Sequence, residues 1–181
     1  MNAIDMTASD SKAQAPKSPF WQFSTKFYAM PGVAPACIAL QDEAGVDVNL
    51  LFFLLWNATL GRTLAESDIK ELDRMVGVWR NTAVIPLREL RRALKSPPPI
   101  LAPEVVEGFR TRIKAVELEA ERLQQEAIYD LAQSGRFERS APSPIEAARA
   151  SIAAYQAILR PFPAAPLEVV LAVFAKSAGN R

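Results

Sequence analysis

The chain contains no histidine and only one cysteine among its 181 residues. Without histidine it cannot build a Ser-His-Asp or Cys-His nucleophile, an imidazole-ligated zinc or iron site, or a proton relay through imidazole. The lone Cys37 can form neither an internal disulfide nor a cysteine-rich metal centre. We therefore expect a cytoplasmic protein with no metal and no cofactor, in which Cys37 is a buried small apolar residue.

Long apolar runs are also missing. The most apolar stretch, Val48 to Trp56, is about half of the roughly 20 residues that a membrane-spanning helix needs, so we expect a core helix and no membrane insertion. Residues 1–18 are polar and lack the apolar core of a secretory signal, which predicts a disordered N-terminal tail. The net charge of only +1 argues against nucleic-acid binding as a function.

Glycine is scarce, with 7 residues, and the 14 prolines cluster between apolar stretches. Apolar residues within those stretches recur with helical spacing, and none alternates convincingly with period two. The pattern predicts an all-α compact bundle of six or seven helices, folded as a single domain over residues 19–181, with residues 136–181 as a more loosely attached C-terminal helical part. The expected helices cover about 19–30, 35–44, 47–60, 63–95, 103–133, 144–159 and 166–178. Pro35 should begin the second of these helices, and Gly45 should end it as a left-handed cap.

Three helices have particular features. The helix over 47–60 is apolar on nearly all sides and should lie at the centre of the fold. Pro86 should kink or break the helix over 63–95 near Val84, while Thr63 and Glu66 have the spacing of a capping box. The longest helix carries a heptad-like apolar seam, which favours an antiparallel helical hairpin inside a bundle: Phe109, Ile113, Val116, Ala120, Leu123 and Ala127.

Two stretches resemble a known family. They are FWQFSTKFYAMPG, which begins at Phe20, and ALQDEAGVDVNLLFFLLW, which begins at Ala39. They are similar to a family of small proteobacterial helical proteins, a domain of unknown function, with FWxFSxxFY and LQxxxGxDVNLLL signatures. The resemblance is specific over about residues 19–60, continues more loosely through WRNTAVIPLRELRRALK and ELEAERL, and ends near Ala132. It implies a compact helical bacterial protein and no particular reaction.

Polar residues stand at the start of the apolar central helix. Asp47 can act as an N-cap by accepting hydrogen bonds from the backbone N–H groups of the first turn. Alternatively, the positive end of this helix could combine with Gln41, Asn49 and Trp56 to line a polar pocket for a small ligand. Both interpretations remain open at this point.

A basic stripe follows in Arg88, Arg91, Arg92 and Lys95, with Arg80 earlier on the same element. It can be a solvated, partly paired face, or the binding surface for an acidic protein partner. A short turn after it would place Lys95 near Glu104 and Arg91 or Arg92 near Glu107. If these pairs form, the stripe would have a structural role only and would not be a binding surface.

Other side chains favour structural roles. The carboxylates Glu117, Glu119, Glu121 and Glu126 lack the histidines that helical di-metal sites use, and Lys114 and Arg122 are placed to neutralise them. Aromatic residues at helical spacing are more often core than ligand cavity. This expectation covers Trp21, Phe23, Phe27, Tyr28, Trp56 and Trp79.

Two function classes remain. The first is a non-catalytic interaction or regulatory protein that presents a helical surface to a protein partner. The second is a small-molecule-binding protein or enzyme with a pocket near Gln41, Asp47, Asn49 and Trp56 and an anion clamp from Arg80 or Arg88. No catalytic residue is predicted and the oligomeric state is not indicated. The candidate ligand or partner residues are Gln41, Asp47, Asn49, Trp56, Trp79, Arg80, Arg88, Arg91 and Arg92.

Overall fold

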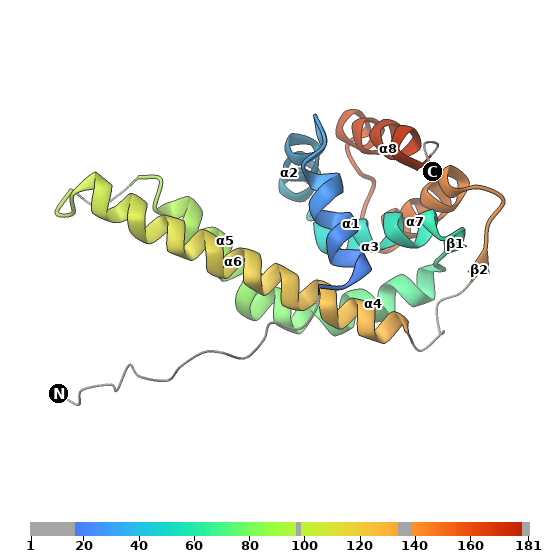
Figure 1. The fold of residues 1–181 in the computed structure, drawn as a ribbon, viewed down its shortest axis with the longest axis horizontal. Helices are drawn as coiled ribbons and strands as arrows, with labels where there is room; N and C mark the ends of the chain where they lie inside the picture. Colours follow the sequence, from blue (N-terminus) through green and yellow to red (C-terminus); the bar gives the residue numbers. More distant parts are fainter. Residues whose placement is uncertain (1–16, 97–98, 134–138, 179–181) are drawn as a thin grey trace.

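The computed structural model describes residues 17–96, 99–133 and 139–178, and the tail expected over 1–18 lies outside this part except for its last two residues. The described chain is almost entirely helical, which confirms the all-α prediction (Figure 1). It contains seven helices when the continuous elements α4, η1 and α5 are counted as one. The elements are α1 Pro19–Tyr28, α2 Val33–Ala44, α3 Val48–Thr59, β1 Arg62–Thr63, α4 Glu66–Trp79, η1 Arg80–Val84, α5 Ile85–Ala93, α6 Pro103–Ala132, β2 Arg139–Ser140, α7 Pro144–Ile158 and α8 Ala164–Ala178.

Capping residues define the first two helices. The Ser18 hydroxyl accepts a hydrogen bond from the Trp21 N–H at 3.0 Å and so begins α1. Gly32, at φ +84°, precedes α2, which starts two residues earlier than Pro35 had indicated. Gly45 ends α2 at φ +70°, which confirms the predicted left-handed cap.

The apolar helix α3 lies at the centre of the molecule, as predicted. Its residues from Leu50 to Leu55 are almost completely buried. Helices α1, α6 and α7 pack around it. A helix without a polar face is stable in water only when it is enclosed in this way.

The start of α4 differs from the prediction. Thr63 does not cap the helix, because it belongs to β1, which pairs antiparallel with β2. The helix begins after Ala65, whose N–H donates to the Asp68 carboxylate at 3.0 Å. The carboxylate that caps the helix therefore belongs to Asp68 and not, as the capping-box spacing had predicted, to Glu66.

At the predicted kink or break near Val84 the structure has a π-helical turn, η1, and the helix runs on from α4 into α5. In a regular α-helix the ring of Pro86 would meet the carbonyl four residues earlier, and its missing N–H would leave that carbonyl without a bond. A wider π turn inserts one extra residue ahead of the proline and relieves this conflict. The chain therefore absorbs the proline without ending the helix.

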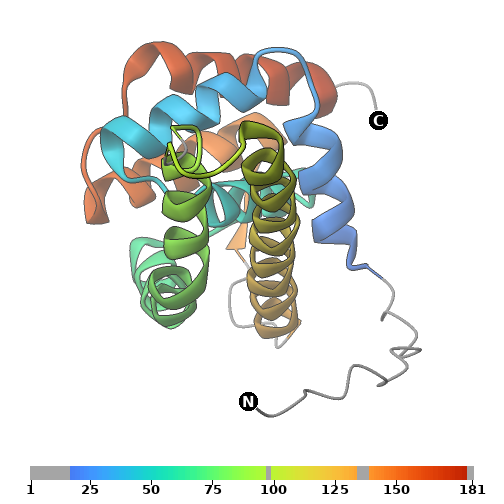
Figure 2. The same cartoon turned by 90° about the vertical axis from the view of Figure 1, so that its left-hand side faces the viewer.

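Helices α5 and α6 form the expected antiparallel hairpin. They lie side by side and project beyond the rest of the bundle, with the turn between them at the far end (Figures 1 and 2). The second half of α6 returns into the bundle, where it contacts α1, α3 and α4. One long helix therefore belongs to the core at one end and to a projecting arm at the other.

The C-terminal helices complete the core. α7 packs on α3 and α8 packs on α2 (Figure 1). Tyr155 of α7 and Phe174 of α8 are buried in the same apolar cluster as Phe53 of α3. Within the described residues no helix combines the length and the apolar composition needed to cross a bilayer.

Candidate functional site

Asp47 is the centre of a buried polar network. One carboxylate oxygen accepts hydrogen bonds from the backbone N–H groups of Asn49 at 2.9 Å and Leu50 at 3.2 Å, which confirms the predicted N-cap. The other oxygen accepts from Arg80 Nη1 at 3.0 Å and from Gln124 Nε2 at 2.7 Å. The carboxylate therefore joins the start of α3 to η1 and α6.

Arg80 occupies the first position of the π turn and reaches two carboxylates. Its Nη1 atom donates to Asp47 and, at 2.7 Å, to Asp73, which lies seven residues, or two turns, earlier on α4. Burial alone would lower the pKa of Arg80, but the charges and hydrogen bonds of Asp47 and Asp73 outweigh it and raise that pKa. The guanidinium is thus held charged between the two carboxylates.

Two further side chains extend the network from elements far apart in sequence. The Tyr155 hydroxyl accepts a hydrogen bond from the Asp47 backbone N–H at 3.0 Å. Gln125 Nε2 donates to Asn49 Oδ1 at 2.7 Å. Sequence reasoning missed Tyr155, Gln124 and Gln125, because their role depends on which helix faces the start of α3, and helical spacing does not specify this.

A cavity of about 330 Å³ adjoins this network. Most of the predicted site residues meet there, on α2, the start of α3, η1 and α5. The lining includes Gln41, Asp47, Asn49, Arg80, Arg88, Arg92 and Tyr155. The arrangement brings the two hypothetical sites, the Asp47 pocket and part of the arginine stripe, into one place.

The two predicted tryptophans lie elsewhere. Trp56 is buried among aromatic rings, with centroids 5.6 Å from Phe20 and 5.5 Å from Tyr129. Trp79 is 39% exposed, and its indole N–H donates to the Ala120 carbonyl on α6 at 2.9 Å. Trp56 is thus a core residue, as expected for the aromatic set, whereas Trp79 and Tyr28 are more exposed than that expectation allowed.

The arginine stripe is paired, although not with the predicted carboxylates. Arg88 bonds to Glu117 at 3.3 Å and to Glu121 at 2.7 Å, and Arg91 bonds to Glu117 through both its Nε and Nη2 atoms. Arg92 bonds to Asp42 of α2 at 2.9 Å.

An ion pair of Arg91 or Arg92 with Glu107 is therefore not formed, although the Arg91 carbonyl accepts a hydrogen bond from Arg110 Nε at 3.3 Å. Glu107 is instead bound by Arg110 of its own helix, at 2.8 Å. The side chains of Arg88 and Arg91 reach a deeper part of α6, where Glu117 is buried.

These pairings limit what the cavity can do chemically. Arg80, Arg88 and Arg92 each already bind a carboxylate, so much of their positive charge is neutralised before any anion could arrive. Burial raises the pKa of Glu121 despite its bond to Arg88. The observed network supports structural roles for these charges more directly than an anion clamp.

One side of α6 presents a row of exposed apolar side chains, which we call the α6 stripe: Val105, Phe109, Val116 and Leu123. Phe109 and Val116 are 41% and 52% exposed. Three of these residues belong to the predicted heptad-like seam, but the structure leaves them open. The hairpin partner α5 contacts another side of α6, where Glu117 and Glu121 meet its arginines.

An exposed apolar face of α4 includes Trp79, which lies next to this stripe. Met75, Val78 and Trp79 follow the i, i+3, i+4 spacing of one helix face and are all exposed. The Trp79 bond to Ala120 fixes this face against α6, between Val116 and Leu123 in sequence. The apolar surface therefore spans two helices.

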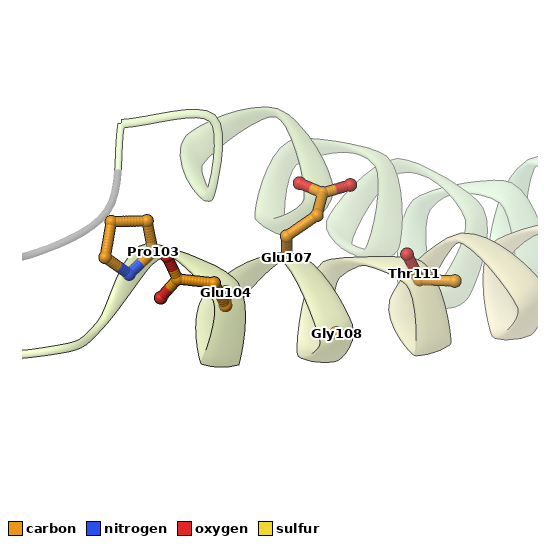
Figure 3. A pocket seen from close by; sticks show the side chains of 5 residues that line it. All are labelled: Pro103, Glu104, Glu107, Gly108 and Thr111. Carbon is orange, nitrogen blue, oxygen red and sulfur yellow. The ribbon is translucent and has the colours of Figure 1, made fainter.

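A shallow hollow of about 520 Å³ lies along the first turns of α6, near the far end of the hairpin (Figure 3). Its lining is Pro103, Glu104, Glu107, Gly108 and Thr111. A Cβ atom added to Gly108 would meet no other atom within 4 Å, so the helix surface is open at this point. None of the predicted site residues lines this hollow.

Comparison with protein-family models identifies a family for this chain. The family model described as "Protein of unknown function (DUF2390)" matches residues 19–128, which is more than half of the chain. The chain belongs to this family. The match covers α1 to most of α6 and so includes Asp47, Arg80 and the α6 stripe, while Tyr155 lies beyond it. Neither a curated protein nor a solved structure was found to match.

Proposed function

We propose that this member of the family is a non-catalytic interaction or regulatory protein of the bacterial cytoplasm, and that the α6 stripe is its contact surface. The observation that supports the proposal is the exposure of four apolar side chains along one side of a projecting helix. Contiguous exposed apolar surface is costly in water and commonly marks a protein interface. A helix face of this kind is a common recognition element.

The arginine stripe is a weaker candidate for the partner surface. Arg88 and Arg91 are bound by Glu117 and Glu121, and Arg92 is bound by Asp42. An acidic partner would compete with carboxylates that are already in place. We therefore assign the contact to the apolar surface, and not to the basic one.

Crosslinking in the native cells tests this proposal. A photo-crosslinking amino acid is placed at Val116, in the middle of the stripe, and at Leu118 as a matched control. The two side chains are 52% and 53% exposed, but they point about 160° apart around the helix. We expect a discrete crosslinked product from position 116 and none from position 118. Absence of any product from position 116 would contradict the proposed function.

The cavity beside Asp47 supports a second candidate function, binding of a small molecule. Six predicted residues line it, and its volume of about 330 Å³ lies at the lower end of the range for small-molecule sites. Ligand-observed NMR with a mixture of polar metabolites would test it, with Gln41→Ala as the control, because Gln41 lines the cavity. Binding that is lost in this variant would favour this function.

A further inference from the structure

The α6 stripe is nearly symmetric about its middle residue. Phe109 lies seven residues before Val116, and Leu123 lies seven residues after it. Val105 and Ala127, both exposed, lie eleven residues to either side. An antiparallel copy of the helix placed over Val116 would therefore set each apolar residue opposite another apolar residue.

The charges beside the stripe are complementary in the same arrangement. Arg112 and Glu119 flank the stripe on one side, four residues before and three residues after Val116. In an antiparallel pair, like flanks face each other, so Arg112 would lie within one residue, about 1.5 Å along the helix, of the copy's Glu119. The two-fold axis would create this contact twice. A parallel pair would instead bring opposite flanks together, so Arg112 would not face the copy's Glu119.

Both charged groups are available for this contact. The Arg112 guanidinium lies over the Phe109 ring, 5.7 Å from its centroid. The Glu119 side chain remains 46% exposed although it binds Arg122 of its own helix at 2.7 Å. Glu119 can therefore accept a further hydrogen bond without losing the one that it has.

The shape of the molecule allows the pairing. The second half of α6 is flanked by α1 and α4, whereas the first half lies on the slender hairpin (Figures 1 and 2). Antiparallel pairing sets the hairpin of one copy along the flanked half of the other. Ser18, at the start of α1, donates its N–H to Glu126, so α1 of one copy would arrive near the open surface at Gly108 of the other.

We propose that the occupant of the α6 stripe is a second copy of this chain, bound antiparallel about a two-fold axis at Val116. The inference rests on the proposed function, since it takes the stripe to be a contact surface, and it names the partner. Trp79, exposed beside Ala120, would contact the Phe109 region of the copy and extend the apolar contact beyond α6.

Sedimentation equilibrium tests the inference. The protein concentration is varied between about 1 and 200 μM, which brackets the dissociation constants expected for an interface of modest area. The wild type should approach twice the 19.9 kDa of one chain as its concentration rises. Val116→Glu should raise the dissociation constant at least about tenfold, because it places two carboxylates at the axis. Leu118→Glu, on the opposite side of α6, should dimerise like the wild type, and circular dichroism confirms that both variants are folded.

Charge exchange tests the register. Arg112→Glu and Glu119→Arg should each weaken the dimer, and the double variant should recover most of the affinity. A mixture of Phe109→Cys and Leu123→Cys chains should form a disulfide between the two different variants under mild oxidation. Homodimeric disulfides from each variant alone would overturn the antiparallel arrangement.

The outcomes separate this inference from the proposed function. A wild type that stays monomeric at every concentration, or a dimer that survives Val116→Glu, overturns the inference. If position 116 then crosslinks in cells to a different protein, the proposed function remains and only the partner is wrong. If position 116 crosslinks to nothing, both fail.

Discussion

The Tyr155 hydroxyl accepts a hydrogen bond from the Asp47 backbone N–H at 3.0 Å, across 108 positions of sequence. The bond ties α7 to the start of the central helix. Tyr155 itself is buried, with its ring 5.4 Å from that of Phe162. Burial, reinforced by the negative charge of Asp47, raises the pKa of Tyr155, so the hydroxyl remains protonated at neutral pH.

Tyr155→Phe should lower the free energy of unfolding by about 1–3 kcal/mol, because it leaves the buried Asp47 N–H without an acceptor. Urea denaturation measures the change. Tyr28→Phe is the control, since Tyr28 is partly exposed, and it should change stability by less than about 0.5 kcal/mol. Equal effects of the two substitutions would contradict the role given to Tyr155.

Asp47→Asn should cost more, about 2–4 kcal/mol, because the partly buried Arg80 guanidinium loses one of its two carboxylates and Asp73 alone remains. Asp42→Asn is the matched control: it breaks the pair with Arg92, in which both side chains are exposed. This second change should cost less than about 1 kcal/mol. Urea denaturation of both variants at pH 7 checks the difference.

Leu51→Ala and Leu54→Ala should each cost about 2–5 kcal/mol, because both leucines are completely buried in α3 and the surrounding helices can close only part of the space. Leu60→Ala, at the exposed end of the same helix, provides the control and should cost far less. Losses below about 1 kcal/mol at both buried sites would show that α3 is not the core helix.

The sequence predicted those parts of the fold that depend on local spacing. Gly45, Asp47 and the apolar run of α3 carry their own signals, and each is found as expected. The pairing of Arg88 with Glu117 was not predictable, because it depends on how far the hairpin helices slide along each other. The turn length suggested Glu107, while the observed register places Arg91 against Glu117.

The candidate site was predictable only in part, for the same reason. Asp47 and Asn49 stand out because they are polar residues at the start of an apolar helix. Gln124, Gln125 and Tyr155 join them from α6 and α7, and nothing in their local sequence distinguishes them from other polar helix residues. The exposure of Phe109, Val116 and Leu123 was equally hidden, since a heptad pattern does not say whether its partner helix is present in the same chain.

Stability should depend on pH through Glu121. Burial raises the pKa of its carboxyl above the ordinary 4.5, although the charge and hydrogen bond of Arg88 oppose this shift. A raised folded-state pKa contributes stability that is fully present below the unfolded value and is lost as pH rises through the folded value. The free energy of unfolding of the wild type should therefore fall, relative to that of Glu121→Gln, as the pH is raised from about 4 towards neutrality. Urea denaturation of both proteins across this pH range measures the difference. A wild type that becomes more stable relative to Glu121→Gln as the pH rises would contradict the prediction.

Charge reversal should lower the stability of the protein far more at Arg88 than at Arg92, although both belong to the arginine stripe. Arg88→Glu places a third carboxylate beside Glu121, which loses its guanidinium, and Glu117, which keeps only Arg91, and should lower stability by about 3–5 kcal/mol. Arg92→Glu breaks only the exposed pair with Asp42 and should cost about 1 kcal/mol or less. Thermal denaturation of the two variants at low and high salt checks this, because the effect at Arg92 should be screened and the effect at Arg88 should persist. A stripe that served only as a free basic surface would instead tolerate both reversals without a change in melting temperature.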